Sequence, residues 1–400
     1  MQDRRRATVM DVRRENRSAV LWRLYFHRPC SRQDLAAATG LSQASMTSVV
    51  RELLTEGLVA EAGSQDSAGG RPRTLLEIDP DYGFVVGVDV GETRIQVGLY
   101  DLTLAERAQT ECRLADPTEH EPETVAQTIA TGLDAVLREA AVGSGSVLGV
   151  GVGVPGIVEQ GSEALVHGQT YGWDAVPLER LLRAHTDLPL RFENCAKTTG
   201  QAELWFGAGR GARSAVVAIL GSGVGASLIT GGGIYRGATS SAGEWGHTKI
   251  VANGRRCRCG STGCLEAYVG AEAILDRAGL ALPADGDEES ALAALAADPS
   301  PAAAEVMAET AEYLGVGIAN LVNLFNPERV VLCGWAARLL GARLLPAVRA
   351  SAGRHALRHP FAATSIELGL LDSDRAALGA ATLPLESVLD SRIRRAAPRR

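Results

Sequence analysis

The stretch FVVGVDVGETRIQVGLYDL, residues 84–102, decides the fold class of this chain. It predicts two extended apolar strands that hinge at Gly91, and the run TECRLAD, residues 110–116, predicts a third strand. A helix is expected over residues 122–141, with its proline tolerated in the first turn, and the buried strand VLGVGVGVP follows it. Strands that lead into a helix and then into another strand predict an α/β layer.

The same pattern begins again at residue 214. The run SAVVAILGSGVGASLITGGGIYRG, residues 214–237, predicts a strand, a glycine turn and a second strand. An alanine-rich, helical region is expected over residues 271–315, and NPERVVLCGW supplies a late buried strand. We therefore expect a duplicated α/β unit with a cleft between its halves.

The residues before position 80 predict a winged helix-turn-helix. One helix is expected over residues 14–26, a second between the capping residue Ser31 and Gly40, and a third from Ser42 after a turn of about three residues. The segment LVAEAGSQDSAGGRPRTLLEID then alternates as a two-stranded wing would. The same spacing also fits a small protein-interaction module, so DNA binding is the favoured interpretation of two.

Polar side chains on the exposed side of the third helix and on the wing can reach base edges and phosphates. The expected DNA contacts are Gln43, Ser45, Thr47, Ser48 and Arg51 on the helix and Arg71 and Arg73 on the wing. Residues 1–78 contain 12 arginines against 9 acidic residues, a net charge of +3, although the whole chain carries −7. The tail SRIRRAAPRR adds five positive charges, which either bind phosphate or are simply solvated.

Composition predicts a soluble, folded chain of two or three domains, with 46% hydrophobic and 22% charged residues in 400. The longest apolar runs are too short and too rich in glycine to cross a bilayer, so we expect no membrane association and a cytoplasmic location. Seven cysteines do not suggest a disulfide framework. We expect Cys30, Cys112 and Cys333 to be inert packing residues.

The run GEWGHTKIVANGRRCRCGSTGCLEAY, residues 243–268, predicts a metal site. Its histidine is followed by three cysteines in the spacing C-x-C-x4-C, and three thiolates with one imidazole suit a closed, structural zinc site. The expected ligands are His247, Cys257, Cys259 and Cys264. Glu244 and Glu266 flank this knuckle, where their carboxylates could accept hydrogen bonds from a hydroxyl-rich ligand.

Two glycine turns are candidate phosphate loops, because backbone N–H groups in such turns can approach phosphate oxygens. Taken alone, each turn is more commonly an ordinary hairpin, but two such turns at the start of two equivalent halves strengthen the phosphate interpretation. The candidate residues are Asp89, Gly91 and Thr93 in the first turn and Gly221, Gly223 and Gly225 in the second.

Together these motifs resemble the ROK family (repressors, open reading frames and sugar kinases) in its winged-helix regulator branch, over about residues 14–385. The resemblance rests on CRCGSTGCLEAY with GEWGH upstream, DVGETR, and the helix-turn-helix ending in GGRPRTLLEID. It implies an actin-like, two-lobed sugar-kinase fold of ribonuclease-H topology behind a winged helix. The expected domains are 1–80, 81–197 and 198–400, the last with the zinc knuckle. The resemblance also implies sugar contacts from Asn194, Glu244, His247 and Glu266.

The sequence departs from the family pattern at three places that matter for phosphoryl transfer. Kinases of the family have Glu-Asn-Asp where this chain has ENC, so Cys195 replaces the general base. Glu92 replaces a glycine of the first phosphate loop, and Cys333 and Trp335 stand near the glycines that would border adenine. We therefore expect no catalytic residue, no bound nucleotide and two vestigial phosphate loops.

The expected function is a DNA-binding transcriptional regulator, in particular a repressor of carbohydrate genes, that responds to a sugar or sugar derivative. Paired winged helices on a palindromic operator imply a homodimer or homotetramer. The alternatives are an ATP-dependent sugar kinase that also binds DNA, and a scaffold whose lobes bind another protein. A redox sensor at Cys195 is disfavoured because no cysteine lies near it in sequence to resolve it.

Overall fold

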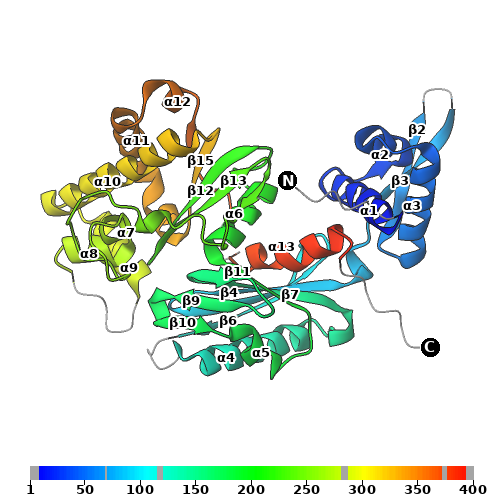
Figure 1. Ribbon diagram of the computed structural model, residues 1–400, viewed down its shortest axis with the longest axis horizontal. Helices are drawn as coiled ribbons and strands as arrows, with labels where there is room; N and C mark the ends of the chain where they lie inside the picture. The colour runs from blue at the N-terminus through cyan, green and yellow to red at the C-terminus, as the bar shows by residue number, and fades with distance from the viewer. Residues whose placement is uncertain (1–8, 68–69, 115–119, 281–286, 372–375, 393–400) are drawn as a thin grey trace.

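The computed structural model describes residues 9–67, 70–114, 120–280, 287–371 and 376–392. Figure 1 shows two α/β lobes and a separate N-terminal domain, drawn in blue. Within these described ranges, no helix is both long and apolar enough to cross a membrane.

The N-terminal domain is a winged helix-turn-helix, as the sequence predicts. Its helices are α1 (Val9–Phe26), α2 (Arg32–Thr39) and α3 (Gln43–Glu56), and its sheet has the order β1 (Cys30–Ser31), β3 (Gly70–Ile78), β2 (Val59–Ser67). Ser31 caps α2 as predicted and forms a capping box with Asp34, and Gly40 ends α2 in the left-handed region at φ 71°. Ser42 caps α3. The local signals thus set both helix boundaries of the motif.

The first lobe is built on a five-stranded sheet of order β11-β7-β4-β5-β6. Its strands are β4 (Phe84–Val90), β5 (Arg94–Asp101), β6 (Glu106–Arg113), β7 (Val147–Val154) and β11 (Leu190–Asn194). A small sheet of β8 (Ile157–Glu159), β9 (Leu165–Gly168) and β10 (Trp173–Val176), with helices α4 (Pro122–Glu139) and α5 (Leu178–Arg183), completes the segment. β6 begins before the expected strand because its pairing with β5 continues back to Glu106; residues 115 and 116 lie outside the described ranges.

The second lobe repeats this arrangement. Its sheet order is β14-β13-β12-β15-β16, with an antiparallel β12-β13-β14 meander and parallel β15 and β16, which matches β4-β5-β6 with β7 and β11. The strands are β12 (Ser214–Leu220), β13 (Val224–Thr230), β14 (Gly233–Tyr235), β15 (Arg329–Cys333) and β16 (Ser365–Leu368). The helices are α6 (Cys195–Phe206), α7 (Glu266–Val269), α8 (Ala271–Arg277), α9 (Glu288–Ala297), α10 (Pro301–Phe325), α11 (Trp335–His355) and α12 (Arg358–Ala362). The predicted duplication is therefore present.

The C-terminal helix α13 (Ala376–Leu389) returns to the first lobe and packs on β4 and β7. Two glycines permit this close approach, since a Cβ at Gly87 would lie 1.8 Å from the Ala377 carbonyl oxygen and one at Gly151 would lie 1.9 Å from that of Ala380. The expected domain boundary at residue 197 falls inside α6, which packs on β12, β13 and α13. The lobes are consequently joined by two helices.

The winged helix is docked onto the lobes through aromatic side chains. Trp22 and Phe26 at the end of α1 meet Trp205 near the end of α6, with ring centroids 5.3 and 5.5 Å apart and edge-to-face geometry. The Trp22 indole N–H also donates to Asp390 just after α13, at 2.9 Å. The DNA-binding domain thus contacts the same two helices that join the lobes.

Candidate functional site

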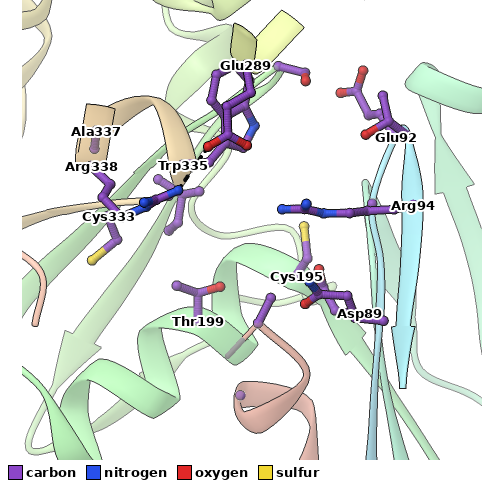
Figure 2. Close-up of a pocket in the computed structure, with 18 of the residues that line it drawn as sticks. Asp89, Glu92, Arg94, Cys195, Thr199, Glu289, Cys333, Trp335, Ala337 and Arg338 are labelled. Carbon is purple, nitrogen blue, oxygen red and sulfur yellow. Dashed lines mark hydrogen bonds and ion pairs between the residues drawn. The ribbon is translucent and has the colours of Figure 1, made fainter. Parts of the chain in front are cut away.

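A cavity of about 880 Å³ lies at the junction of the two lobes. The first lobe contributes the turn between β4 and β5, and the second contributes α6, the start of α9 and the start of α11. In Figure 2, Asp89, Glu92 and Arg94 lie on one side of it and Trp335, Ala337 and Arg338 on the other. Its size is ample for a small-molecule ligand.

Cys195 is the first residue of α6, and its side chain faces this cavity close to Asp89 (Figure 2). Burial, reinforced by the negative charge of Asp89, raises the pKa of the thiol to about 12. At neutral pH the group is therefore an uncharged thiol, a poor general base and an unreactive nucleophile. Burial also raises the pKa of Asp89 to about 6, against the opposing effect of Arg94.

Glu92 is part of an ion pair rather than an isolated charge. Its two carboxylate oxygens accept hydrogen bonds from the two terminal nitrogens of Arg258, at 2.8 and 3.1 Å. Arg258 belongs to the cysteine knuckle of the second lobe, so this pair spans the two lobes. No local sequence pattern indicates that Glu92 has a partner 166 residues away.

Two backbone donors at the second glycine turn already have acceptors within the chain. The Gly221 N–H bonds to the Gly223 carbonyl oxygen at 3.0 Å, and the Val224 N–H donates to Glu266 Oε2, also at 3.0 Å. A backbone N–H that holds a carboxylate of its own chain is not free for a ligand phosphate. Both glycine turns are present where the sequence places them, in the form of hairpin turns with internal partners.

Among the residues expected to contact a sugar, Glu244, His247 and Glu266 influence one another electrostatically, and Asn194 stands apart from them. Burial raises the pKa of Glu244, the nearby charges of His247 and Lys197 oppose this rise, and the charge of Glu266 adds to it. Asn194 instead caps α6: its Oδ1 accepts from the Ala196 and Lys197 N–H groups, and its Nδ2 donates to the Gly156 carbonyl oxygen at 2.6 Å. One amide hydrogen of Asn194 is left for a ligand.

Lys197 is a buried cation that the sequence did not single out. Its side chain is 2% exposed, and its ammonium donates to the Ser240 carbonyl oxygen at 2.6 Å. Burial lowers its pKa, and Glu193 and Glu244 counter this. Glu193 in turn pairs with Arg236 at 2.7 Å. The residues on either side of Cys195 thus hold the segment between Arg236 and Glu244 over the start of α6.

The far wall of the cavity is formed by the region that the sequence marked with Cys333 and Trp335. Both residues line it, and a Cβ at Gly221 would lie 2.9 Å from the Trp335 indole nitrogen. Glu289 and Arg338 form an ion pair at 2.9 Å within this wall (Figure 2). Burial and the neighbouring Glu203 raise the pKa of Cys333, as suits an inert thiol.

The four predicted metal ligands converge. The ligand atoms of His247, Cys257, Cys259 and Cys264 all lie within 4.8 Å of one another, so this group could hold a metal ion. His247 ends the short helix η5 (Trp245–His247), and two isolated bridges, 249 with 264 and 256 with 262, fold the knuckle back on itself. Lys249 donates to the Cys264 sulfur at 2.8 Å.

The predicted DNA face agrees with the burial pattern of α3. Met46, Val49, Val50 and Leu53 pack inward, while Gln43, Thr47, Ser48 and Arg51 are exposed. Ser45 is half-buried, with its hydroxyl bonded to that of Ser42 at 3.0 Å. Arg73 is exposed on the wing. The Arg71 side chain and residues 393–400 of the basic tail lie outside the described part of the chain.

Comparison with known proteins separates the two parts of the chain. Residues 85–387 match the ROK family and residues 15–62 match the MarR family. A putative xylose repressor from Caldicellulosiruptor sp. (strain Rt8B.4) is 29% identical, covering 94% of this chain and 97% of that protein. A glucokinase from Halalkalibacterium halodurans is 32% identical, covering 74% and 92%. The crystal structure of a ROK family transcriptional regulator, a homolog of the E. coli MLC protein, superposes with a TM-score of 0.79 at 24% identity, covering 95% and 97%, which supports the fold.

Asp89→Asn is expected to raise the free energy of unfolding at pH 7.5 by about 1 to 2 kcal/mol, because asparagine avoids a buried charge. The pKa of Asp89 in the folded chain, about 6, lies above its ordinary value of 3.8. The ionisation penalty is therefore present above pH 6 and disappears as the pH falls below about 4. Thermal denaturation across this range, with the largely exposed Asp81→Asn as control, measures the difference. A gain that is equally large at pH 4 would contradict the assignment.

Proposed function

The chain belongs to the ROK family, and from that premise we propose that it is a sequence-specific transcriptional regulator, a repressor of carbohydrate genes gated by a sugar or sugar derivative. The observation that carries this proposal is a winged helix whose third helix presents exposed polar side chains. The similarity to a putative xylose repressor over nearly the whole chain supports it. The proposal assigns DNA binding to residues 1–80, with operator contacts from Gln43, Ser45, Thr47, Ser48, Arg51, Arg71 and Arg73.

Helix α6 gives the proposal a mechanism. Its first residue, Cys195, lines the cavity, and Trp205 near its other end packs on α1 of the winged helix. The helix has 12 residues and is therefore about 18 Å long. A ligand that shifts the start of α6 also shifts the end of this helix, where Trp205 packs on the winged helix. Ligand binding would thereby change the spacing of paired winged helices in a homodimer or homotetramer on a palindromic operator.

The ligand proposed for the lobes is a sugar held by Asn194, Glu244, His247 and Glu266. Glu244 is half-buried and Glu266 is buried, and carboxylates at such positions favour hydroxyl donors over anions. A sugar hydroxyl can also bond the remaining amide hydrogen of Asn194. Cys195 replaces the carboxylate of the kinases, so this position contributes a weak hydrogen-bonding group to the ligand.

The metal proposed for the knuckle is structural zinc. A tetrahedral Zn²⁺ with about 2.3 Å to sulfur and about 2.0 Å to nitrogen needs sulfur atoms about 3.8 Å apart and sulfur about 3.5 Å from nitrogen. Here the Cys259 and Cys264 sulfurs are 3.7 Å apart, and the Cys257 sulfur is 3.6 Å from His247 Nδ1. Four protein ligands leave no open position for a catalytic water, so zinc would cross-link the loop that carries Arg258.

An ATP-dependent sugar kinase is the second candidate, and the similarity to a glucokinase is the observation that favours it. Against it stand the un-ionised thiol of Cys195 and the paired side chain of Glu92. We therefore propose that the chain has no kinase activity and that its glycine turns bind no nucleotide.

The first experiment is fluorescence anisotropy on DNA from upstream of the gene itself, at physiological salt, with a panel of sugars and sugar phosphates. We expect tight binding that one sugar weakens or strengthens. Arg51→Ala should lower the affinity about tenfold and reduce the salt dependence by about one ion, because it removes a contact at the DNA surface. Arg354→Ala, on the second lobe, is the control. Equal binding by wild type and Arg51→Ala would contradict the assignment of α3.

Metal analysis by mass spectrometry should find one zinc per chain. Cys259→Ser is expected to lose the metal and to lower the free energy of unfolding by about 3 kcal/mol or more, because a closed site contributes its binding energy to folding. Cys112→Ser, outside the knuckle, should retain both metal and stability. A metal-free wild-type protein of unchanged stability after chelation would rule out a structural zinc site.

Kinase activity is tested by ADP release with ATP and a panel of hexoses. We expect none from the wild type, and none from Cys195→Asp alone, because restoring the general base leaves the Glu92 and Arg258 pair in place. The glucokinase-like relatives provide the positive control for the assay. Hexose-dependent turnover by the wild-type chain would establish the kinase alternative.

A further inference from the structure

We propose that the ion pair between Glu92 and Arg258 stands in the place of a nucleotide's phosphates, joining the two lobes and excluding phosphate-bearing ligands from the cavity. The inference goes beyond the regulator assignment and does not depend on DNA binding. Glu92 and Arg258 would then determine ligand specificity. The cavity would accept neutral ligands, and the two lobes would be held together without a bound nucleotide.

The pair is well formed and comes from opposite lobes. Glu92 belongs to the turn between β4 and β5, and Arg258 lies between Cys257 and Cys259 in the knuckle. Two hydrogen bonds of 2.8 and 3.1 Å give it the bidentate geometry in which guanidinium and carboxylate interact most strongly. Both side chains are mostly buried, 23% and 30% exposed, so solvent screens the pair only in part.

The pair also lies directly over the second glycine turn. A Cβ at Gly223 would lie 3.3 Å from Arg258 Nη2 and 3.6 Å from Glu92 Oε1. Glu266 holds the other side of the guanidinium, with Oε1 3.6 Å from Arg258 Nε, while its Oε2 accepts from the Val224 N–H. The ion pair thus lies against Gly223 of the second turn, where backbone N–H groups would cradle phosphates, while Gly91, Thr93 and Ser222 still line the open cavity.

The backbone that presents Glu92 is held by an aromatic group from the first lobe. The imidazole of His120 bonds the Glu92 carbonyl oxygen at 3.0 Å, and the Tyr171 hydroxyl donates to the Gly91 carbonyl oxygen. His120 and Tyr171 stack with ring centroids 4.5 Å apart, and the Trp173 indole N–H donates to the His120 carbonyl oxygen. The carboxylate is therefore pre-positioned for its partner, which reduces the entropy lost in forming the pair.

These contacts decide which ligands the cavity admits. A phosphate that approached Arg258 would have to displace Glu92, leaving an unpaired carboxylate beside the new anion. A neutral sugar meets no such cost. Removing only the charge of Glu92 would free both terminal nitrogens of Arg258 beside a glycine turn, with Glu266 at 3.6 Å from Nε as the remaining ionic partner, and guanidinium nitrogens in that position can bind an anion.

The test uses the full-length protein and three single variants. Glu92→Gln and Arg258→Gln each break the pair, and Glu289→Gln is the matched control, because Glu289 pairs with Arg338 in the wall of the same cavity but within one lobe. Isothermal titration with sodium tripolyphosphate and with MgATP measures anion binding. Hydrogen exchange of the amides in residues 91–94 and 221–224 measures how firmly the lobes are held together.

We expect the wild type, Glu289→Gln and Arg258→Gln to bind tripolyphosphate and MgATP negligibly, and Glu92→Gln to bind tripolyphosphate at least about tenfold more tightly than the wild type. Amide exchange in both turns should rise about three- to tenfold in Glu92→Gln and Arg258→Gln and stay unchanged in Glu289→Gln. The double variant Glu92→Gln with Arg258→Gln should exchange at the rate of either single variant, since each already removes the whole interaction.

The proposal is overturned if the wild type binds tripolyphosphate as tightly as Glu92→Gln does, or if breaking the pair leaves exchange in both turns at the wild-type rate. Additive increases in the double variant would also overturn it, because they would mean that the two side chains act separately. Anisotropy on DNA is measured in parallel. A chain that fails to bind DNA but shows the expected anion binding and exchange refutes the regulator proposal and leaves this one standing.

Discussion

The structure depends on the way α6 is held at both of its ends. At the start, Asn194 caps the helix and ties it to the first lobe through the Gly156 carbonyl oxygen, while the buried ammonium of Lys197 fixes it to the segment that ends at Glu244. Near the other end, Trp205 is enclosed by aromatic side chains of α1. A helix fixed in this way transmits displacement along its axis with little bending, because its backbone hydrogen bonds are all internal. The cavity and the winged helix therefore lie at opposite ends of one element.

The cysteine knuckle contributes one side of the contact between the lobes. His247 is one of its four candidate metal ligands, Arg258 pairs with Glu92 of the first lobe, and Glu266 follows the last cysteine by two residues. These three residues come from a segment with little regular secondary structure, which a small apolar core alone would hold loosely. A bound ion with four protein ligands gives such a loop the rigidity that a helix or strand has by itself. The polar groups around the cavity can therefore be fixed in position without being placed on a sheet.

The sequence predicted the parts of the fold that depend on local signals. Caps at Ser31, Gly40 and Ser42 bounded the helix-turn-helix, and glycine turns marked both hairpins. The metal cluster was predictable because one histidine and three closely spaced cysteines are a typical ligand set for zinc. The return of α13 to the first lobe was not, since it depends on contacts of Gly87 and Gly151 with residues more than 200 positions away. The partner of Glu92 lies 166 residues away and was likewise not predictable, whereas the capping role of Asn194 rests on a local N-cap signal that the sequence analysis missed.

The return of α13 has a consequence for how the chain is made. Synthesis proceeds from the N-terminus, so the winged helix leaves the ribosome first and can fold early, as domains generally do. The first sheet is complete by residue 194, but the face that α13 covers stays open until the last residues have been added. The hydrogen bond from the Trp22 indole N–H likewise cannot form until Asp390 has been added. The winged helix of a nascent chain can therefore fold well before the two lobes are complete. A chain truncated near its end would keep a folded winged helix but would lack complete lobes.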